Sequence, residues 1–276
     1  MLTFIQSNTL LLFYFGFGLL GVCVGSFINV VIHRLPIMIR YQQHSYCYGL
    51  LDLDEEEKPP CNLIWPRSNC PHCSTPVNPR HNIPVISYVW LVGKCHSCEK
   101  KISIRYPLIE CITAAMTLHA GFVFGPTVAL LFALVFCWFL ISLCFIDIET
   151  QLLPDNLTLP LLWIGLIANY SSLFNTLESA VLGAVFGYCS LWLIYHIHRL
   201  ITGKPSMGYG DFKLLAALGA WTGWELLPMI ILLSSISGIL FGLIKILLKH
   251  NQPRTPIAFG PFLAGAGWAT LFWGMH

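Results

Sequence analysis

Charged residues are scarce in this 276-residue chain, because Asp, Glu, Lys and Arg together make up 10% of it while 56% is hydrophobic. Soluble domains usually carry about 25% charged residues, so this composition could not cover a surface that faces water. The net charge of +2 is too small to suggest a nucleic-acid partner. The composition excludes an ordinary soluble domain and predicts an all-α polytopic membrane protein in contact with lipid.

The first apolar run, roughly residues 10–32, lacks the features of a cleaved signal peptide. No basic region precedes it, no small-residue cleavage site follows it, and it is longer than the apolar part of such peptides. We therefore expect a retained first span.

Further apolar runs are long enough to cross a bilayer. About eight transmembrane helices are expected, and the sixth is the shortest. The expected spans are residues 10–32, 107–124, 128–146, 157–173, 179–198, 212–224, 228–248 and 257–274.

The fifteen Lys and Arg residues predict the orientation. Nine lie between the first and second expected spans, three flank the connection from the fifth to the sixth, and three flank that from the seventh to the eighth. Since positive charge favours the cytoplasmic side, eight spans with both termini in the periplasm place every one of these residues inside. The resulting division is a first span (1–32), a small cytoplasmic domain (33–106) and a seven-span domain (107–276).

The cytoplasmic domain contains two C-x-x-C pairs, Cys70/Cys73 and Cys95/Cys98, with 21 residues between them. This spacing is typical of a structural zinc site with four thiolate ligands and no open position for a catalytic water. Redox dithiols and unrelated cysteines are the alternatives. The acidic stretch 52–58 is expected to be a solvated excursion of the same domain.

Two acids stand at the ends of expected spans on the predicted cytoplasmic face. Asp147 closes the third span, and Asp211 precedes the sixth in the sequence G-Y-G-D, whose glycines are expected to allow unusual torsions and close approach. Two neighbouring buried carboxyl groups share a proton, so one can take a proton from water while the other donates to a scissile carbonyl. This is the chemistry of an aspartic protease.

Other interpretations of these acids remain open, since spacing alone cannot bring Asp147 next to Asp211. Each acid could be an interfacial charge or a helix cap, or part of the proton relay of a secondary transporter. A transporter predicts internal repeats, and none is visible. A membrane metalloprotease lacks its H-E-x-x-H motif, and a non-enzymatic assembly factor is a further alternative.

Several motifs together resemble the type IV prepilin leader peptidase/N-methyltransferases, which belong to the G-x-G-D class of membrane aspartic proteases. The resemblance lies in their order and spacing along nearly the whole chain. The matching segments are residues 25–36 (GSFINVVIHRLP), the two C-x-x-C pairs, and residues 146–155, 208–213 and 256–262.

The resemblance implies that Asp147 and Asp211 form the catalytic pair at the cytoplasmic face of a bacterial inner membrane. It also implies that the substrates are type IV prepilins and the pseudopilins of type II secretion. The enzyme would remove their basic leader and then methylate the new N-terminus with S-adenosylmethionine as donor.

The residues themselves indicate the donor site only weakly, since no G-x-G-x-x-G motif follows a predicted strand. We expect it to be built from the first loop and the adjoining span ends, with Gly25, Ser26, Asn29 and Arg34 as candidates. Tight helix packing is the alternative for Gly25 and Ser26, and a bond to another helix is the alternative for Asn29. Residues 256–262 either line the active site or form a span-entry turn.

Overall fold

The computed structural model describes residues 2–51, 61–78, 83–204, 207–248 and 257–274, with side chains from residue 12 onward. The acidic stretch 52–58 lies outside these residues. The described residues are mostly helical and contain no strand, only the isolated bridges Asn69–Pro76 and Lys94–Lys101. The all-α expectation is therefore confirmed for this part of the chain.

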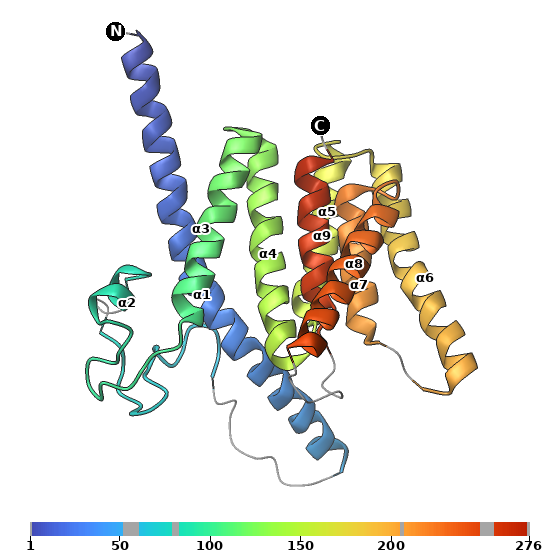
Figure 1. The fold of residues 1–276 in the computed structure, drawn as a ribbon, viewed down its shortest axis with the longest axis horizontal. Coiled ribbons are helices and arrows are strands. Elements are labelled where there is room, and N and C mark those ends of the chain that lie inside the picture. The colour runs from blue at the N-terminus through green and yellow to red at the C-terminus, as the bar shows by residue number, and fades with distance from the viewer. Residues whose placement is uncertain (1, 52–60, 79–82, 205–206, 249–256, 275–276) are drawn as a thin grey trace. The chain divides into compact units, whose positions relative to one another are not determined.

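The chain forms two compact units, Met1–Pro126 and Thr127–His276. The division expected from the sequence placed residues 107–124, the second expected span, with the following spans. In the structure this segment belongs to the first unit. The helices, in the order of Figure 1, are α1 (Leu2–Leu50), α2 (Ile86–Trp90), α3 (Arg105–Phe124), α4 (Val128–Thr150), α5 (Asp155–Tyr170), α6 (Leu177–Thr202), α7 (Tyr209–Thr222), α8 (Leu227–Leu247) and α9 (Gly260–Trp273).

Five described helices are long and apolar enough to cross a membrane, namely α1, α3, α4, α6 and α8. The chain is thus a multi-pass membrane protein. The other three expected spans coincide with α5, α7 and α9, which have 16, 14 and 14 residues. These are shorter than the roughly 20 residues that a straight span needs.

In the first unit, α1 is much longer than the expected span, because the helix continues through Pro36 to Leu50. Hydropathy marks where the chain stops being apolar, not where the helix ends, so it placed the boundary at residue 32. The helix packs against α3 through two glycines one turn apart. A Cβ atom on Gly21 would lie 2.7 Å from Cα of Ala114, and one on Gly25 would lie 2.7 Å from Cα of Glu110. Small residues at this spacing let two helices approach closely.

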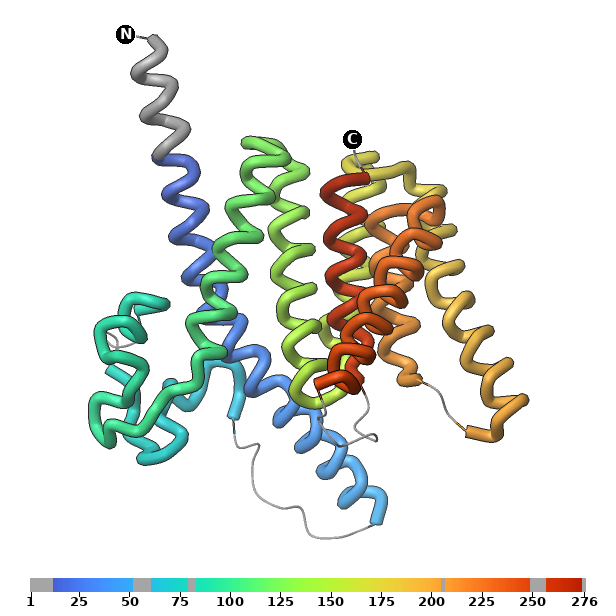
Figure 2. Tube along the Cα trace, viewed as in Figure 1, coloured from blue at the N-terminus to red at the C-terminus, as the bar shows by residue number. Residues whose placement is uncertain are grey.

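In the second unit, α7 forms the core and packs against α5, α6 and α9 (Figure 2). Every residue of α7 from Leu214 to Thr222 is buried. Small residues make this possible, since Gly183 on α6 faces Gly219 so closely that neither glycine has room for a Cβ atom. Helix α9 also packs against α4 and α8.

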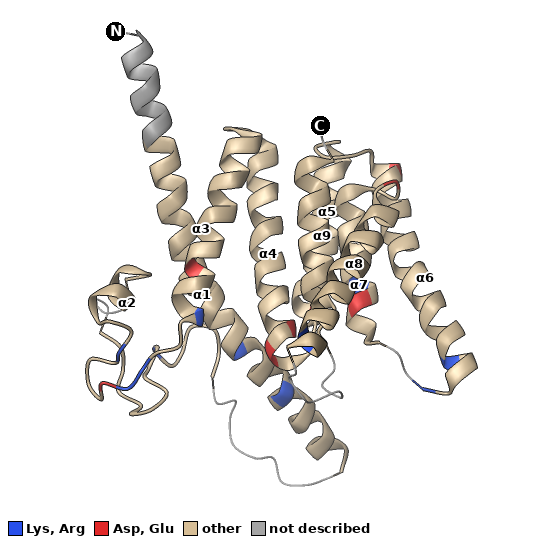
Figure 3. Cartoon of the chain, in the orientation of Figure 1, with Lys and Arg blue, Asp and Glu red and all other residues tan. Residues whose placement is uncertain are grey.

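The basic residues that the structure describes in the second unit gather at one end of its helices (Figure 3). Arg199 lies in the last turn of α6, Lys213 near the start of α7, and Lys245 in the last turn of α8. The opposite end has the acid Glu178 in the first turn of α6. Within this unit, the charge asymmetry read from the sequence is therefore a real polarity of the helix bundle.

Candidate active site and cysteine cluster

Asp147 lies near the end of α4, and its side chain is only 5% exposed. Its Oδ2 atom accepts a hydrogen bond of 2.9 Å from the amide N–H of Gly260, the first residue of α9. The free N–H groups at a helix N-terminus stabilise a negative charge. A Cβ atom on Gly260 would stand 2.6 Å from that oxygen, so glycine is needed for the contact.

Asp211 lies in the first turn of α7 and is 8% exposed. Its backbone N–H donates to the carbonyl of Gly208 at 3.3 Å. Its Oδ1 atom is buried and has no hydrogen-bond partner among the described residues. One oxygen of this carboxyl group is therefore available to a ligand or to water.

The structure brings Asp147 and Asp211 together at the basic end of the second unit. A Cβ atom on Gly210 would lie 2.7 Å from Cβ of Leu153, and Cδ2 of the same leucine lies 3.2 Å from the Cβ position of Gly260. The residue beside Asp211 and the residue bonded to Asp147 thus pack on one leucine. The carboxyl group of Asp147 lies within electrostatic reach of Asp211, so the two acids are neighbours in the fold.

The glycines before Asp211 do not have the unusual torsions expected from the sequence. Gly208 has φ −81° and ψ 150°, which is ordinary extended backbone, and Gly210 lies within helix α7. Of the two glycines, only Gly210 is closely approached by a neighbouring side chain, that of Leu153. A Cβ atom on Gly208 would have no neighbour nearer than 3.9 Å.

An ion pair stands beside the two acids. The ammonium group of Lys213 on α7 donates to both carboxylate oxygens of Asp155, at 2.7 and 2.8 Å. Asp155 is the first residue of α5, so the pair ties the start of α5 to the start of α7. The segment that carries Leu153 leads directly into it.

The described part of segment 256–262 lines the pair of acids through Gly260, and Pro256 lies outside the described residues. The structure therefore supports the interpretation in which this segment lines the site of the two acids. The sequence motif indicated the segment but not Gly260 itself, because a residue that acts through its backbone N–H cannot be identified from its side chain.

The four cysteines of the two C-x-x-C pairs form a second cluster, in the first unit. The Sγ atoms of Cys70, Cys73, Cys95 and Cys98 all lie within 4.8 Å of one another, and those of Cys70 and Cys98 are 3.8 Å apart. Tetrahedral zinc with Zn–S bonds of about 2.3 Å requires S···S distances of about 3.8 Å. The cluster therefore fits a four-thiolate zinc ion.

The two halves of the cluster have the same backbone geometry. In each, the first cysteine's N–H donates to the carbonyl five residues later, Thr75 or Lys100, at 3.0 and 2.9 Å. The residue after each pair, Ser74 or Glu99, has φ +55°. This repeated turn aims both thiols of a pair at one point, which unrelated cysteines do not require.

The surroundings of Cys73 favour a thiolate. The hydroxyl of Thr75 lies 2.8 Å from its Sγ atom, and hydrogen bonds from the side chain and backbone of Thr75 lower the pKa of the Cys73 thiol to about 6. A thiolate is the form that binds a metal.

The four candidate residues for the methyl donor have different surroundings in the first unit. Gly25 lies against the backbone of α3, which favours the packing interpretation, and the hydroxyl of Ser26 hydrogen-bonds to Glu110. The side chain of Asn29 donates a hydrogen bond to the carbonyl of Tyr106 on α3. This agrees with the alternative interpretation of Asn29 as a residue that bonds to another helix.

Arg34 donates to the carbonyls of Asn62 and Pro66 at 2.8 and 2.6 Å and so holds the start of the loop domain. Glu110 is a buried acid that was not among the candidates.

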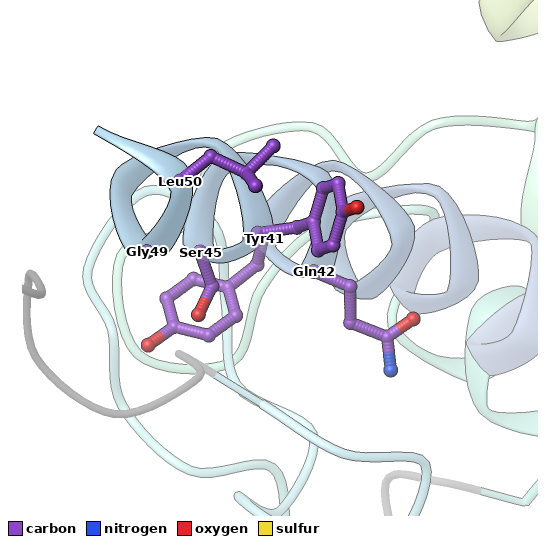
Figure 4. A pocket seen from close by; sticks show the side chains of 6 residues that line it. Tyr41, Gln42, Ser45, Gly49 and Leu50 are labelled. Carbon is purple, nitrogen blue, oxygen red and sulfur yellow. The ribbon is translucent and has the colours of Figure 1, made fainter. Parts of the chain in front are cut away.

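A shallow hollow of about 580 Å³ lies on the C-terminal part of α1 (Figure 4). It is lined by residues of this helix alone and contains no acid: Tyr41, Gln42, Ser45, Tyr46, Gly49 and Leu50. Because its lining has neither a carboxyl group nor a thiol, this hollow is not a candidate for the active site or the metal site.

Comparisons with known proteins extend over both units. A sequence model of the type IV leader peptidase family matches residues 134–243, and one of the bacterial peptidase A24 N-terminal domain matches residues 19–124. The prepilin leader peptidase/N-methyltransferase of Aeromonas hydrophila is 49% identical over 258 residues, 93% of this chain and 89% of that protein.

Proteins of the same name from two other bacteria are similarly related. That of Pseudomonas aeruginosa is 50% identical over 257 residues, 93% of this chain and 89% of its own length. That of Legionella pneumophila is 47% identical over 262 residues, 95% of this chain and 91% of its own length. No solved structure matches the chain.

Proposed function

The chain belongs to the type IV leader peptidase family, and from this premise we propose that it cleaves the leader from prepilins and pseudopilins and N-methylates the new N-terminus. The observation that carries the cleavage reaction is the pairing of buried Asp147 and Asp211 at the basic end of the second unit. The name that these relatives share, prepilin leader peptidase/N-methyltransferase, supports both activities.

In the proposed mechanism the two carboxyl groups hold one proton between them, because two adjacent buried carboxylates do not both ionise readily. Water bound at the unpartnered Oδ1 atom of Asp211 loses a proton to the pair while it attacks the scissile carbonyl. The pair returns a proton to the leaving amine. Neither acid is given a fixed role, since the pair titrates as a unit.

Gly260 orients the pair in this mechanism. Its N–H group binds Oδ2 of Asp147, which leaves Oδ1 of that carboxyl group to take part in the proposed proton sharing. Asp147 alone would be enough to cap the N-terminus of α9. The presence of a second buried acid, Asp211, with one oxygen atom that has no partner among the described residues, supports a catalytic role over the interpretation as a helix cap.

We place the active site at the cytoplasmic face of a bacterial inner membrane, with eight spans and both termini in the periplasm. The basic residues at the end of the second unit that holds Asp147 support this orientation. The short helices α5, α7 and α9 complete the eight spans, and α7, enclosed by protein, needs no full-length lipid-facing surface. The basic leader then stays in the cytoplasm while the apolar helix of the substrate enters the bilayer.

Cys70, Cys73, Cys95 and Cys98 hold a structural zinc ion in this proposal, which the mutual distances of their Sγ atoms support. The ion cross-links a loop region that has few buried apolar residues. Four protein ligands leave no position for substrate, so the zinc stabilises the domain and does not take part in either reaction.

S-adenosylmethionine supplies an electrophilic methyl group when bound. The residues that fit its site best are Ser26 and Asn29, with Gly25 and Arg34 supporting the backbone around them. The test measures cleavage and methylation separately in the same variants. Asp147→Asn and Asp211→Asn should abolish cleavage, while methylation of a pre-cleaved peptide persists in both variants. A secondary transporter or an assembly factor without activity predicts no cleavage by the wild-type protein.

A further inference from the structure

A buried polar cluster between α1 and α3 has no part in the proposed cleavage reaction. Its members are Glu110 on α3, 7% exposed, and Asn29 on α1, 4% exposed. An acid in a membrane helix costs free energy unless it is paired or functional. The partners of these two side chains show what the cluster lacks.

Glu110 accepts hydrogen bonds only from neutral donors. The backbone N–H of Val85 donates to its Oε2 atom at 2.7 Å, and the Ser26 hydroxyl donates to the same carboxyl group. No cation contacts Glu110 within the described residues. Val85 itself has φ +59°, a strained torsion for a β-branched residue, so the backbone is held in an unfavourable form at the point where it meets this acid.

Asn29 presents a free acceptor to the same region. Its amide NH₂ group donates to the carbonyls of Gly25 and Tyr106, at 3.2 and 3.1 Å. The orientation of the amide is therefore fixed, and Oδ1 points away from both carbonyls. This oxygen is buried and has no partner in the part of the chain that the structure describes.

The two acceptors belong to one site. Tyr106, which Asn29 contacts, is one helical turn before Glu110 on α3, and the Cβ position of Gly25 lies 2.7 Å from Cα of Glu110. The cluster therefore combines a negative charge with an unpartnered acceptor and offers no donor that is not already in use. Such a set suits a cation that carries several N–H groups.

We propose that Glu110, Ser26 and Asn29 form a subsite for an alkylammonium group. The inference rests on the proposed methyltransferase function, in which two ligands carry this group. One is the new N-terminal amine of the cleaved substrate, and the other is the amino group in the methionine part of the donor. Glu110 binds the charge, Ser26 holds the carboxyl group in place, and Asn29 accepts a further N–H.

The test measures binding by the full-length protein in detergent, with two matched pairs of ligands. S-adenosylhomocysteine is compared with its N-acetyl derivative, which keeps the carboxylate and lacks the ammonium group. A pre-cleaved substrate peptide is compared with its N-acetyl form. The wild-type protein should prefer the charged ligand of one pair by about tenfold or more, the usual effect of a hydrogen bond to a charged group.

Glu110→Gln keeps the shape of the side chain and removes its charge, so this preference should fall below about threefold. The pair of ligands that responds identifies the source of the ammonium group. Thr113→Val is the matched control, because Thr113 is buried one turn away on the same helix and its hydroxyl bonds only to the carbonyl of Ile109. The control should leave both preferences unchanged.

A preference that is the same in Glu110→Gln and wild type for both pairs overturns the inference. If Glu110→Gln also loses cleavage and so fails to fold, Ser26→Ala carries the test, with an expected loss of about threefold in the same pair. A wild-type protein that binds these ligands but methylates no peptide contradicts the proposed function, while the binding comparison still decides on the subsite.

Discussion

The backbone N–H of Gly260 donates a hydrogen bond of 2.9 Å to Oδ2 of Asp147, across 113 positions of sequence. The contact places one of the two acids at the N-terminus of α9 and fixes the direction of its carboxyl group. It also leaves no room for a side chain at residue 260. The geometry of the acid pair therefore depends on a residue that contributes no functional group.

Gly260→Ala should lower the cleavage rate by about tenfold or more. The added methyl group would stand 2.6 Å from Oδ2 of Asp147, so the carboxyl group must turn and lose a charge-assisted hydrogen bond of about 1.5–3 kcal/mol. Initial rates on a prepilin substrate check this. Gly265→Ala is the matched control on the same helix, because nothing lies within 4 Å of its Cβ position. Equal rates for the two variants would show that the contact does not matter.

Gly25→Ala should destabilise the first unit by about 1–3 kcal/mol, the usual cost of overpacking. The new Cβ atom would stand 2.7 Å from Cα of Glu110, which belongs to the helix backbone and cannot move aside alone. Thermal unfolding in detergent measures the effect. The control is Gly16→Ala, at a position on the same helix with open space around it. A stable Gly25→Ala protein that fails to bind the methyl donor would instead favour a direct role in the donor site.

Purified protein should contain about one zinc ion per chain, and replacement of Cys70 and Cys73 by serine should remove it. Metal analysis by mass spectrometry, together with unfolding of the loop domain, checks both statements. Cys61→Ser in the same unit is the control, since Cys61 is not one of the four clustered cysteines. Full activity and stability in a metal-free preparation would contradict the structural role.

Asp155→Asn should reduce cleavage far less than substitution of Asp147 or Asp211. Asp155 pairs with Lys213, and the two side chains are 51% and 31% exposed, so water screens the pair and its contribution is about 1 kcal/mol or less. The double exchange Asp155→Lys with Lys213→Asp should restore part of any loss, because it rebuilds the tie between α5 and α7. Loss of cleavage as complete as that of Asp147→Asn would place Asp155 in the chemistry.

Sequence patterns predicted the positions of the helices well and their lengths less well. Apolar runs identified α3 to α9 within a few residues, and Pro154 stands directly before the start of α5. The end of α1 was missed by 18 residues, from 32 to 50, because polar residues continue a helix without any signal in hydropathy. The lengths of α5 and α7 are within one residue of their expected spans, and only α9, with 14 residues, is clearly shorter than the expected span 257–274.

The site shows a similar division between what side chains reveal and what they do not. Asp147, Asp211 and the clustered cysteines were predicted, because their chemistry requires those side chains. Gly260 acts through its backbone, and Glu110 resembled any acid near a span end, so neither could be identified from residue type. Only the fold brings Leu153 between Gly210 and Gly260 and thereby pairs the two acids.

The most direct test of the account is cleavage of a prepilin substrate by Asp147→Asn and Asp211→Asn, with membrane insertion verified for each protein. Glu178→Gln is the control, since this acid lies in the first turn of α6 at the end of the unit away from the pair. We predict that each aspartate variant loses cleavage entirely and that the control retains the wild-type rate. Substantial cleavage by either aspartate variant would contradict the paired mechanism.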